Sequence, residues 1–475
     1  MKLSELIENL DIADVLNFSD VEICTVTQNS KKCNSASIFV AIKGSRFDGA
    51  DFIPEALSKG VGAIVTERRL NVNLKNIIIV KNARKTLAEL CAKMSGNPER
   101  KLFFTGITGT KGKTSTAYIL SEILNFSGEK NLLIGTLGVK GISYKNFRNT
   151  TPDPTVLFPI FKKAFHSGIK NVSLEVSSQA LKDYRVHGIP FDCVAFTGIS
   201  RDHIGISEHP NFSDYLISKR KLFTSFGAKR AVVNFDDAYS SYVSENVAKT
   251  VKCGFSHGSD YRITDFSNTP FGSEFCISKI KIRTSLPGEY NARNITMAIA
   301  IAKEMYGFDI KEISGAVEKI IIPGRFERQV VNGRNVIIDY AHNGISFAEV
   351  MSLSKKLYPG KIISVFGSVG ERSFERRQEI ANAAEKYSDL SVITSDNPGY
   401  ESAISICDEI FGCFSDKSKA KILVDRSEAI KYAIENSSVG DTVLILGKGR
   451  ENTMKINGSY LEYSDFDVVR QLGAM

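Results

Sequence analysis

The sequence lacks several features that would exclude an ordinary globular protein of the cytoplasm. Its eight cysteines, among them Cys24, Cys91, Cys193 and Cys276, form no CxxC pair, and no basic N-terminus leads into an apolar core. No apolar run approaches the ~20 uninterrupted residues that a membrane span requires. A repeat of fixed period and a low-complexity tract are also missing. We therefore expect a cytoplasmic protein with reduced thiols and no membrane insertion.

The length and the hydrophobic content of the chain predict several folded domains. The chain has 475 residues, of which 43% are hydrophobic, and one domain usually takes about 150 residues. The net charge is +8, but lysines and arginines are spread along the chain and do not alternate with aromatic residues. This distribution argues against a nucleic-acid partner, and small anionic substrates explain the positive excess as well.

Short buried-type runs separated by polar breaks predict three α/β domains. A polar segment at 95–100 and the sequence Pro323-Gly324-Arg325 mark the two boundaries, giving domains at 1–97, 98–324 and 325–475. The central domain should hold a mostly parallel sheet, and the third should be a doubly wound, Rossmann-like domain. The expected strands are 37–42, 62–66 and 77–80 in the first domain, 101–105, 131–135, 172–175, 193–197 and 231–234 in the second, and 336–339, 361–366, 390–394, 421–424 and 441–446 in the third.

A glycine-rich stretch at 106–114, GITGTKGKT, follows the expected strand 101–105 and precedes a helical pattern at 115–126. Such a loop lets backbone N–H groups approach a polyphosphate, while Lys113 supplies positive charge and Thr114 a hydroxyl suited to Mg²⁺. The strict pattern GxxxxGK[ST] is not met, because Ile107 stands where its first glycine belongs. The loop predicts ATP or GTP binding, and a plain strand-to-helix turn is the alternative.

Polar residues at expected strand ends predict where a ligand would bind. Glu175 ends one strand and His203 follows another, so both should face the phosphate loop, where they could hold Mg²⁺. In the third domain, Asp339–His342 and Gly447–Glu451 occupy equivalent positions. Strand-end hydrogen bonding and turn formation explain each of these residues singly as well.

Taken together, the motifs make the chain recognisable. It resembles the ATP-dependent Mur ligases of peptidoglycan synthesis, and within them the branch of UDP-N-acetylmuramoyl-tripeptide synthetases. The resemblance covers nearly the whole chain. It rests on 28–30 and 37–41 in the first part, on 108–114, 149–152, 175–178, 201–203, 215–223 and 291–294 in the second, and on 323–327, 339–342, 396–398 and 447–451 in the third.

The resemblance implies a ligase that joins an amino acid to the γ-carboxylate of D-glutamate in UDP-N-acetylmuramoyl-L-alanyl-D-glutamate. ATP converts that carboxylate into an acyl phosphate, and the incoming amine displaces phosphate. In such a reaction the protein contributes mainly placement and charge neutralisation. The first domain would bind the UDP substrate, the second ATP and the third the amino acid, and we expect a monomer.

The resemblance also implies roles for individual residues. Those at the nucleotide would be Gly109, Thr110, Lys111, Gly112, Lys113, Thr114, Ser115, Asn291, Asn294, Arg325 and Asp339. Those holding the UDP substrate would be Ser30, Asn149, Thr150, Thr151, Ser177 and Arg185. Catalysis would depend on Lys113, Glu175, His203 and Lys219, and Mg²⁺ would be held with the help of Thr114, Glu175, His203 and Lys219.

Lys219 aligns with the lysine that this family carries as a carbamate, N6-carboxylysine, formed with CO₂. The modification turns an ammonium into a carboxylate able to bind Mg²⁺ or orient substrate. An unmodified lysine on a helix surface is the alternative. One further departure from the family is Lys111, which stands where the loop usually has asparagine.

The amino acid is expected to be L-lysine, with L-ornithine or another diamino acid behind it. Arg372, Asp396, Asn397, Gly447 and Glu451 align with the amino-acid-binding residues. The branch that adds meso-diaminopimelate carries Asp-Asn-Pro-Arg, but here Gly399 follows Asp396-Asn397-Pro398. Losing a charge-assisted arginine contact forfeits about 1.5–3 kcal/mol, which disfavours diaminopimelate.

Two other functions remain open. The neighbouring Mur ligase that adds D-alanyl-D-alanine shares the ATP machinery, although the motifs at 396–398 and 447–451 argue against it. A P-loop ATPase switch would use the same loop to drive motion, and a polynucleotide could stimulate it. The ligase instead requires both the UDP-muramyl-dipeptide and an amino acid.

Overall fold

The structure, a computed structural model, describes residues 1–473 except 45–46, 70–74, 145–146, 148, 203, 206–207 and 372. Its internal contacts divide the chain into two compact units. The first comprises Met1–Thr264, Cys276–Ile280 and Arg293–Ala316, and the second comprises Asp265–Phe275, Lys281–Ala292 and Val317–Met475. The division of the sequence into domains at 97 and 324 stays a prediction.

The first unit begins with a five-stranded sheet in the order β1-β5-β4-β3-β2, in which β1 is antiparallel to β5 and the other pairs are parallel. Alternate residues of its strands face opposite sides: Ile38 and Val65 pack with Leu87 of α3, whereas Phe39 packs with Ala56 of α2. Its elements are α1 (Leu3–Ile7), β1 (Ile12–Leu16), β2 (Thr25–Thr27), β3 (Ser37–Val40), α2 (Ile53–Ser58), β4 (Ala63–Thr66), β5 (Ile77–Val80) and α3 (Ala83–Ser95).

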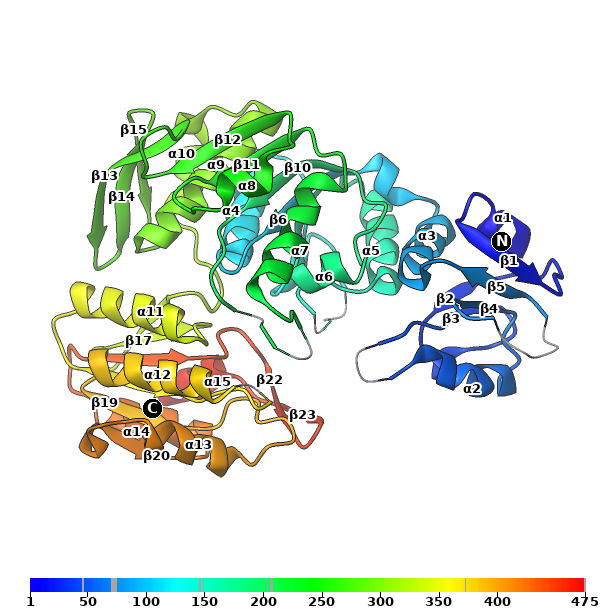
Figure 1. The fold of residues 1–475 in the computed structure, drawn as a ribbon. Coiled ribbons are helices and arrows are strands. Elements are labelled where there is room, and N and C mark those ends of the chain that lie inside the picture. Colours follow the sequence, from blue (N-terminus) through cyan, green and yellow to red (C-terminus); the bar gives the residue numbers. More distant parts are fainter. Residues whose placement is uncertain are drawn as a thin grey trace. The chain divides into compact units, whose positions relative to one another are not determined.

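The central sheet has ten strands in the order β15-β14-β13-β12-β11-β10-β6-β9-β7-β8, with helices on both faces (Figure 1). Its strands are β6 (Phe103–Thr108), β7 (Asn131–Gly135), β8 (Gly138–Lys140), β9 (Asn171–Glu175), β10 (Phe191–Phe196), β11 (Arg230–Asn234), β12 (Lys249–Gly254), β13 (Tyr261–Thr269), β14 (Gly272–Ile277) and β15 (Ile280–Thr284). The helices are α4 (Lys113–Phe126), α5 (Pro154–His166), α6 (Ser178–Lys182), α7 (Phe212–Thr224), α8 (Ser240–Ser244), α9 (Glu289–Tyr306) and α10 (Ile310–Glu318).

The middle of this sheet is parallel, as expected from its buried strands. β6 pairs in parallel with β9 on one side and with β10 on the other, and the register places Ile107 opposite Glu175 and Thr108 opposite Phe196. Three carboxyl ends therefore meet at one edge of the sheet. A ligand binds at such an edge in open α/β sheets, so the topology itself puts the loop after Thr108 and the Glu175 side chain together.

The second unit contains a six-stranded sheet in the order β16-β17-β21-β18-β19-β20 and a two-stranded one, β22-β23. Only the β16–β17 pair of the larger sheet is antiparallel. Its strands are β16 (Glu327–Val331), β17 (Arg334–Asp339), β18 (Ile362–Phe366), β19 (Leu390–Ile393), β20 (Ala420–Ile422), β21 (Thr442–Leu446), β22 (Thr453–Ile456) and β23 (Ser459–Glu462). The helices are α11 (Gly344–Leu357), α12 (Phe374–Tyr387), α13 (Ala403–Gly412), α14 (Arg426–Glu435) and α15 (Asp465–Gly473).

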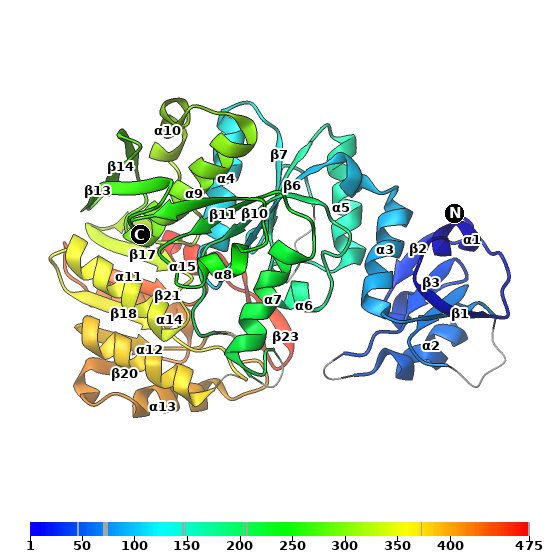
Figure 2. The same cartoon turned by 45° about the horizontal axis from the view of Figure 1, so that its top comes forward.

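The period-two pattern of these strands produces two cores. Ile337 and Leu444 pack against α11, α12 and α13, whereas Val336 and Val443 pack against α14 and α15. The turned view in Figure 2 shows the same arrangement of α11, α12 and α13 along one side of this sheet. The expected α/β architecture with doubly wound sheets is thus confirmed.

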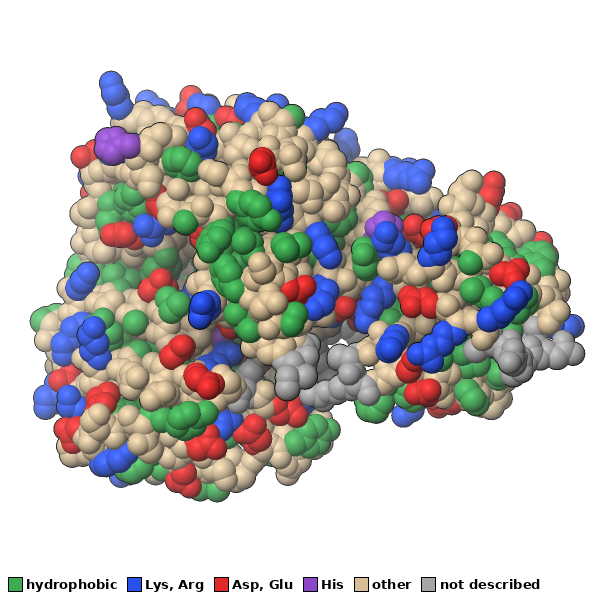
Figure 3. Space-filling view, viewed as in Figure 1, with side chains coloured by type: hydrophobic (Ala, Val, Ile, Leu, Met, Phe, Trp, Pro, Cys, Tyr) green, Lys and Arg blue, Asp and Glu red, His purple; other side chains and the backbone are tan. Residues whose placement is uncertain are grey.

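The surface and the thiols agree with the composition. Across the face drawn in Figure 3, lysine and arginine side chains are interspersed with aspartate and glutamate and do not gather into one basic patch. All eight cysteines fall in the described ranges and are free thiols. Among the helices that the structure describes, none is long and apolar enough to cross a membrane.

Candidate functional site

The loop between β6 and α4 is a backbone turn that tolerates no side chain at two positions. Gly112 has a φ of +81°, and a Cβ there would lie 2.5 Å from Oδ1 of Asn294. At Gly109 a Cβ would lie 2.0 Å from Oγ1 of Thr197. Since α4 begins at Lys113, the loop presents the N-terminus of a 14-residue helix, and helix N-termini attract phosphate.

Two lysines meet at this loop. The Lys113 ammonium donates to the carbonyl oxygens of Gly109 (2.8 Å) and Thr110 (3.0 Å), and the Lys219 ammonium donates to the same Gly109 oxygen at 2.7 Å. Lys219 is 1% exposed. Burial first, and then the charge of Lys113, lower the pKa of Lys219 well below its usual range, against the opposing pull of Asp202. The Lys219 amine is therefore more easily deprotonated than an ordinary lysine.

Glu175 lies against the first turn of α4. Its Oε2 accepts a hydrogen bond from Thr114 Oγ1 at 2.8 Å, and its Oε1 accepts one from the Thr136 backbone N–H at 2.9 Å. The neighbouring Gly135 leaves room for the carboxylate, because a Cβ there would lie 1.9 Å from Oε1. Thr136 was not anticipated from the sequence, although it follows directly on a strand that was.

The donors here fit Mg²⁺, which takes one or two protein oxygens and completes its shell with water and phosphate oxygens. Thr114 and Glu175 would supply a hydroxyl and a carboxylate oxygen. Among the described residues, no group of three or more His, Cys, Asp or Glu could hold a metal by itself. The expected contribution of His203 lies outside the described residues.

The residues expected at the UDP substrate extend this cluster. Thr151 Oγ1 donates to the Glu175 carbonyl at 2.8 Å, and it accepts from the Ser177 N–H at 3.0 Å. Arg185 donates from Nη1 to the Thr151 carbonyl at 3.1 Å. Oγ1 of Thr150 lies 3.0 Å from Oγ1 of Thr136. Four residues that the sequence placed together in function are therefore neighbours in space.

Two other residues of that group lie apart from this network. Ser30 is buried in the N-terminal α/β part, where its hydroxyl donates to Glu55 Oε2 at 2.5 Å. Asn149 is exposed. The described contacts thus engage Ser30 with α2 and leave Asn149 at the surface.

Of the other residues expected around the nucleotide, Asn294, Thr110 and Ser115 belong to the first unit and Asn291 to the second. Asn294 Oδ1 accepts from Thr116 Oγ1 at 3.3 Å and lies beside Gly112. Thr110 Oγ1 lies 3.0 Å from the Tyr215 hydroxyl. Ser115 is buried in the first turn of α4. On α9, three residues before Asn294, Asn291 donates from its side chain to the Pro287 carbonyl at 2.8 Å.

In the second unit, Asp339 ends β17 and binds backbone N–H groups on both sides of the strand pair β16–β17. Its carboxylate accepts from the N–H groups of Phe326 and Ala341, each at 2.6 Å. The Arg325 guanidinium lies 4.2 Å from the ring centroid of Tyr340. Arg325 thus lies against the residue that follows Asp339, and the nucleotide roles of both residues stay predictions.

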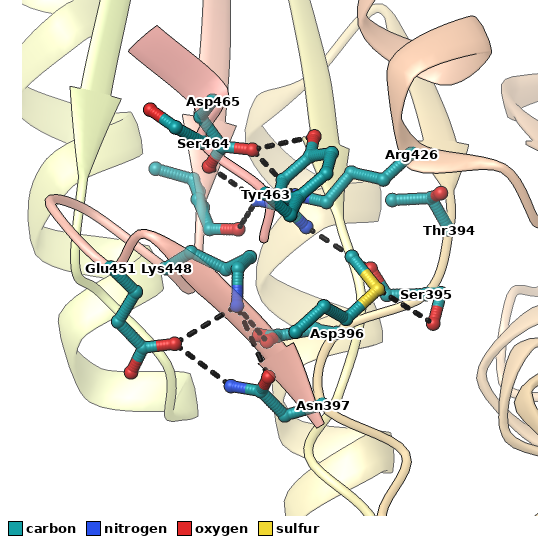
Figure 4. Close-up of polar contacts among 12 residues, drawn as sticks. Thr394, Ser395, Asp396, Asn397, Arg426, Lys448, Glu451, Tyr463, Ser464 and Asp465 are labelled. Carbon is teal, nitrogen blue, oxygen red and sulfur yellow. Dashed lines mark hydrogen bonds and ion pairs between the residues drawn. The ribbon is translucent and has the colours of Figure 1, made fainter. Parts of the chain in front are cut away.

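A separate polar cluster joins the ends of β19 and β21 (Figure 4). Asn397 donates from Nδ2 to Glu451 Oε2 at 2.8 Å, and a Cβ on Gly447 would lie 2.4 Å from Asp396 Oδ2. The structure thus gathers four of the five residues expected to bind the amino acid. The fifth, Arg372, lies outside the described residues. Lys448, at the centre of the cluster, was not anticipated because buried lysines are rare.

Chemically, the two clusters differ. The one at the phosphate loop combines a helix N-terminus, two lysines and a buried carboxylate, which suits a polyphosphate with Mg²⁺. The one at Asp396 combines carboxylates and an amide, which suits groups that donate hydrogen bonds, such as ammonium.

Three models of protein families match the chain in succession. Residues 22–95 match the model described as "Mur ligase family, catalytic domain", residues 107–302 match "Mur ligase middle domain", and residues 324–449 match "Mur ligase, glutamate ligase domain".

Individual relatives are similar over nearly their whole length. The UDP-N-acetylmuramoyl-L-alanyl-D-glutamate--2,6-diaminopimelate ligase of Aquifex aeolicus is 38% identical over 462 residues, covering 96% of this chain and 95% of that protein. The ligase of the same name from Bacillus cereus is 33% identical over 487 residues, covering 99% and 98%. A solved structure titled as a ligase of this name matches with a TM-score of 0.68 and 26% identity, covering 100% of this chain and 99% of the other.

Proposed function

Because the chain belongs to the Mur ligase family, an ATP-dependent family of amide-forming ligases, we propose that it adds a diamino acid to UDP-N-acetylmuramoyl-L-alanyl-D-glutamate. The bond would form at the γ-carboxylate of the D-glutamate. The observation that carries this proposal is the convergence of Lys113, Thr114, Glu175 and Lys219 on one glycine loop. That cluster supports phosphoryl transfer to a carboxylate.

The reaction needs charge neutralisation more than covalent help from the protein. The substrate carboxylate attacks the γ-phosphorus of ATP, the bond to the β–γ bridging oxygen breaks, and ADP leaves. The amine then attacks the acyl phosphate, loses a proton and displaces phosphate. Lys113 and the loop amides would stabilise the charge on the transferred group, and Thr114 with Glu175 would hold Mg²⁺, which neutralises phosphate oxygens when bound.

Lys219 has the properties that carbamate formation needs. A neutral amine attacks CO₂, a nitrogen–carbon bond forms, and one proton leaves, so that a carboxylate replaces the ammonium. Burial and the neighbouring Lys113 charge lower the pKa of Lys219, which favours the neutral amine. The carboxylate formed would also relieve the repulsion between the two ammonium groups that share the Gly109 carbonyl.

The UDP substrate would lie along the hydroxyls and the guanidinium that adjoin Glu175. Thr150, Thr151 and Ser177 offer hydroxyl groups, and Arg185 offers a guanidinium suited to a carboxylate or pyrophosphate. Ser30, in the short helical turn that follows β2, would contact the UDP substrate from the N-terminal part of the chain.

For the amino acid, meso-diaminopimelate is now the first candidate, since the similar ligases of Aquifex aeolicus and Bacillus cereus are named for it. The L-lysine expected from the sequence becomes the second candidate, and one observation favours it. Gly399 has a φ of +68°, and a Cβ there would lie 3.9 Å from Glu371 Oε2. A carboxylate beside this position favours an ammonium group over a second carboxylate.

The experiment measures phosphate release with Mg-ATP, UDP-N-acetylmuramoyl-L-alanyl-D-glutamate and a panel of meso-diaminopimelate, L-lysine and L-ornithine. Phosphate should appear only when dipeptide and amino acid are both present, and kcat/KM for each amino acid ranks the candidates. Turnover of D-alanyl-D-alanine in place of a diamino acid, or ATP hydrolysis stimulated by a polynucleotide alone, would refute the proposal.

A further inference from the structure

Lys448 is a fully buried cation that the family resemblance gave no role. It lies two residues beyond the end of β21 and is 0% exposed. Its ammonium donates to Asn397 Oδ1 at 3.1 Å and to Glu451 Oε2 at 2.9 Å (Figure 4). It also donates to the Thr453 carbonyl at 2.8 Å. All three donors of the ammonium are thus matched to acceptors.

Around Lys448, carboxylates outnumber cationic side chains. Oδ1 of Asp396, itself buried, lies 3.9 Å from the ammonium, so two carboxylates, those of Asp396 and Glu451, share one cation. The nearby Arg426 pairs with Asp465 at 2.8 Å and leaves no net charge. Within these five side chains the carboxylates outnumber the cations by one, which suits a single ammonium group of an incoming amino acid.

The contacts of Lys448 also set the direction of the Asn397 amide. Asn397 has a φ of +43°, in the left-handed region that asparagine tolerates better than most residues other than glycine. Its Oδ1 accepts from Lys448 Nζ and from the Lys455 N–H (2.9 Å), while its Nδ2 donates to Glu451. Because Lys448 holds both the amide oxygen of Asn397 and the carboxylate of Glu451, it orients two side chains at once.

We propose that Lys448 is a positioning residue for the amino-acid substrate: it fixes Asn397 and Glu451 in the orientation that receives the substrate and leaves one carboxylate charge for the substrate's ammonium. This inference rests on the proposed function. A purely structural role is the competing explanation, because removing one partner of a buried ion pair leaves the other charge uncompensated and is destabilising. The pattern of KM values and the pH profile below distinguish the two roles.

The test compares Lys448→Met with Lys421→Met, which removes an exposed lysine from β20 of the same unit. We expect Lys448→Met to raise KM for the amino acid at least about tenfold and to leave KM for ATP and for the UDP-dipeptide within about twofold, since a hydrogen bond to a charged group is at stake. The control should match the unchanged protein. A proportional fall in kcat with all three KM values unchanged would overturn the inference.

A pH profile supplies a readout that a structural role would not move. Burial raises the pKa of Asp396, Lys448 and Arg426 oppose this, and Glu451 and Asp465 add to it; Tyr340 and Tyr463 are the other titratable groups nearby. Without Lys448 the Asp396 carboxylate should take up its proton at higher pH. The acid limb of kcat/KM for the amino acid should then move up by about one pH unit or more.

A conservative variant keeps the inference testable if Lys448→Met fails to melt cooperatively. Lys448→Arg retains the charge but moves the donors, so it should raise KM for the amino acid while the acid limb stays in place. If Lys448→Arg leaves that KM unchanged, or shifts the acid limb, the inference is wrong. If the protein without substitutions releases no phosphate with any amino acid, the proposed function is wrong. If it is active but the Lys448 variants have the same KM for the amino acid, only the role of Lys448 is wrong.

Discussion

Two buried lysines show how the surroundings of one residue type determine its chemistry. Lys219 lies against a carbonyl oxygen that also receives the Lys113 ammonium, so its environment favours loss of a proton. Lys448 instead lies among the carboxylates of Asp396 and Glu451. We therefore expect the first to react with CO₂ and the second to orient its neighbours.

The proposed carbamylation of Lys219 gives a direct prediction. With ¹³C-bicarbonate, the protein should show a carbamate carbonyl signal in its NMR spectrum, and Lys219→Arg should lose both that signal and at least about a hundredfold in kcat, because guanidinium does not react with CO₂ and cannot replace a carboxylate. Lys221→Arg, two residues along the same helix, serves as the control and should keep both. An undiminished carbamate signal in Lys219→Arg would exclude the assignment.

At the scale of elements, the strand-to-helix turn before α4 is the proposed phosphate site. It depends on the close approach of neighbouring groups: Gly112 adopts a left-handed conformation and packs on Asn294 of α9. Gly128, just after the same helix, has nearly the same φ of +82°, yet a Cβ there would meet nothing within 4 Å. Substitutions at these two glycines can therefore be compared to separate the cost of a left-handed backbone from the cost of a steric clash.

Accordingly, Gly128→Ala should cost about 1 kcal/mol of unfolding free energy, from the left-handed backbone alone. Gly112→Ala should cost about 3 kcal/mol, since Asn294 must also move, and it should weaken ATP binding, which Gly128→Ala should not. Urea unfolding and ATP titration of both variants provide the measurement. Equal losses of stability in the two variants would contradict the clash.

The elements also show where sequence patterns are informative. Strands buried on both faces, such as β7 and β21, stand out as apolar runs and were predicted nearly to the residue. The partly exposed strands β1 and β13, and the hairpin β22–β23, were missed because exposure dilutes their apolar pattern. Strand β6 extends to Thr108, beyond its predicted end at 105, since it pairs with β9 and β10 along its whole length.

For the whole molecule, stability in acid should depend on carboxylates held by the fold. Asp236 accepts from Arg293 at 2.6 Å and from the Phe255 and Ser256 N–H groups, and although burial opposes ionisation, these bonds lower the pKa of Asp236 below its ordinary value of 3.8. A bond from Lys249 likewise lowers the pKa of Glu304 below 4.5. Stability from lowered pKa values is fully present above those ordinary values and is lost as the pH falls through the folded-state values.

Titration of Asp236 should therefore leave the melting temperature nearly constant down to a pH of about 4. Below that pH the melting temperature should drop as Asp236 becomes protonated. Asp236→Asn should melt lower at neutral pH and lose part of the drop in acid. Scanning calorimetry between pH 7 and pH 3 measures both effects. Parallel curves for the two proteins at all pH values would show that Asp236 does not contribute.

At this scale too, the preferred amino acid is the property for which the sequence motif and the similar proteins disagree. The motif ending in Gly399 argued for L-lysine, but the similar ligases named for diaminopimelate support the other substrate. A single position reports the loss of one contact, whereas selectivity is a difference between the summed contacts of two substrates.

By itself, the sequence determined the family, the α/β class and the phosphate loop, because buried strands, glycine turns and strand-end carboxylates leave local patterns along the chain. Only the tertiary structure decided that Lys219 shares a carbonyl with Lys113, that Thr136 supports Glu175, and that Lys448 orients Asn397 and Glu451. These contacts mostly join residues far apart in the chain, and the burial that alters their charges exists only once the sheets and helices have packed.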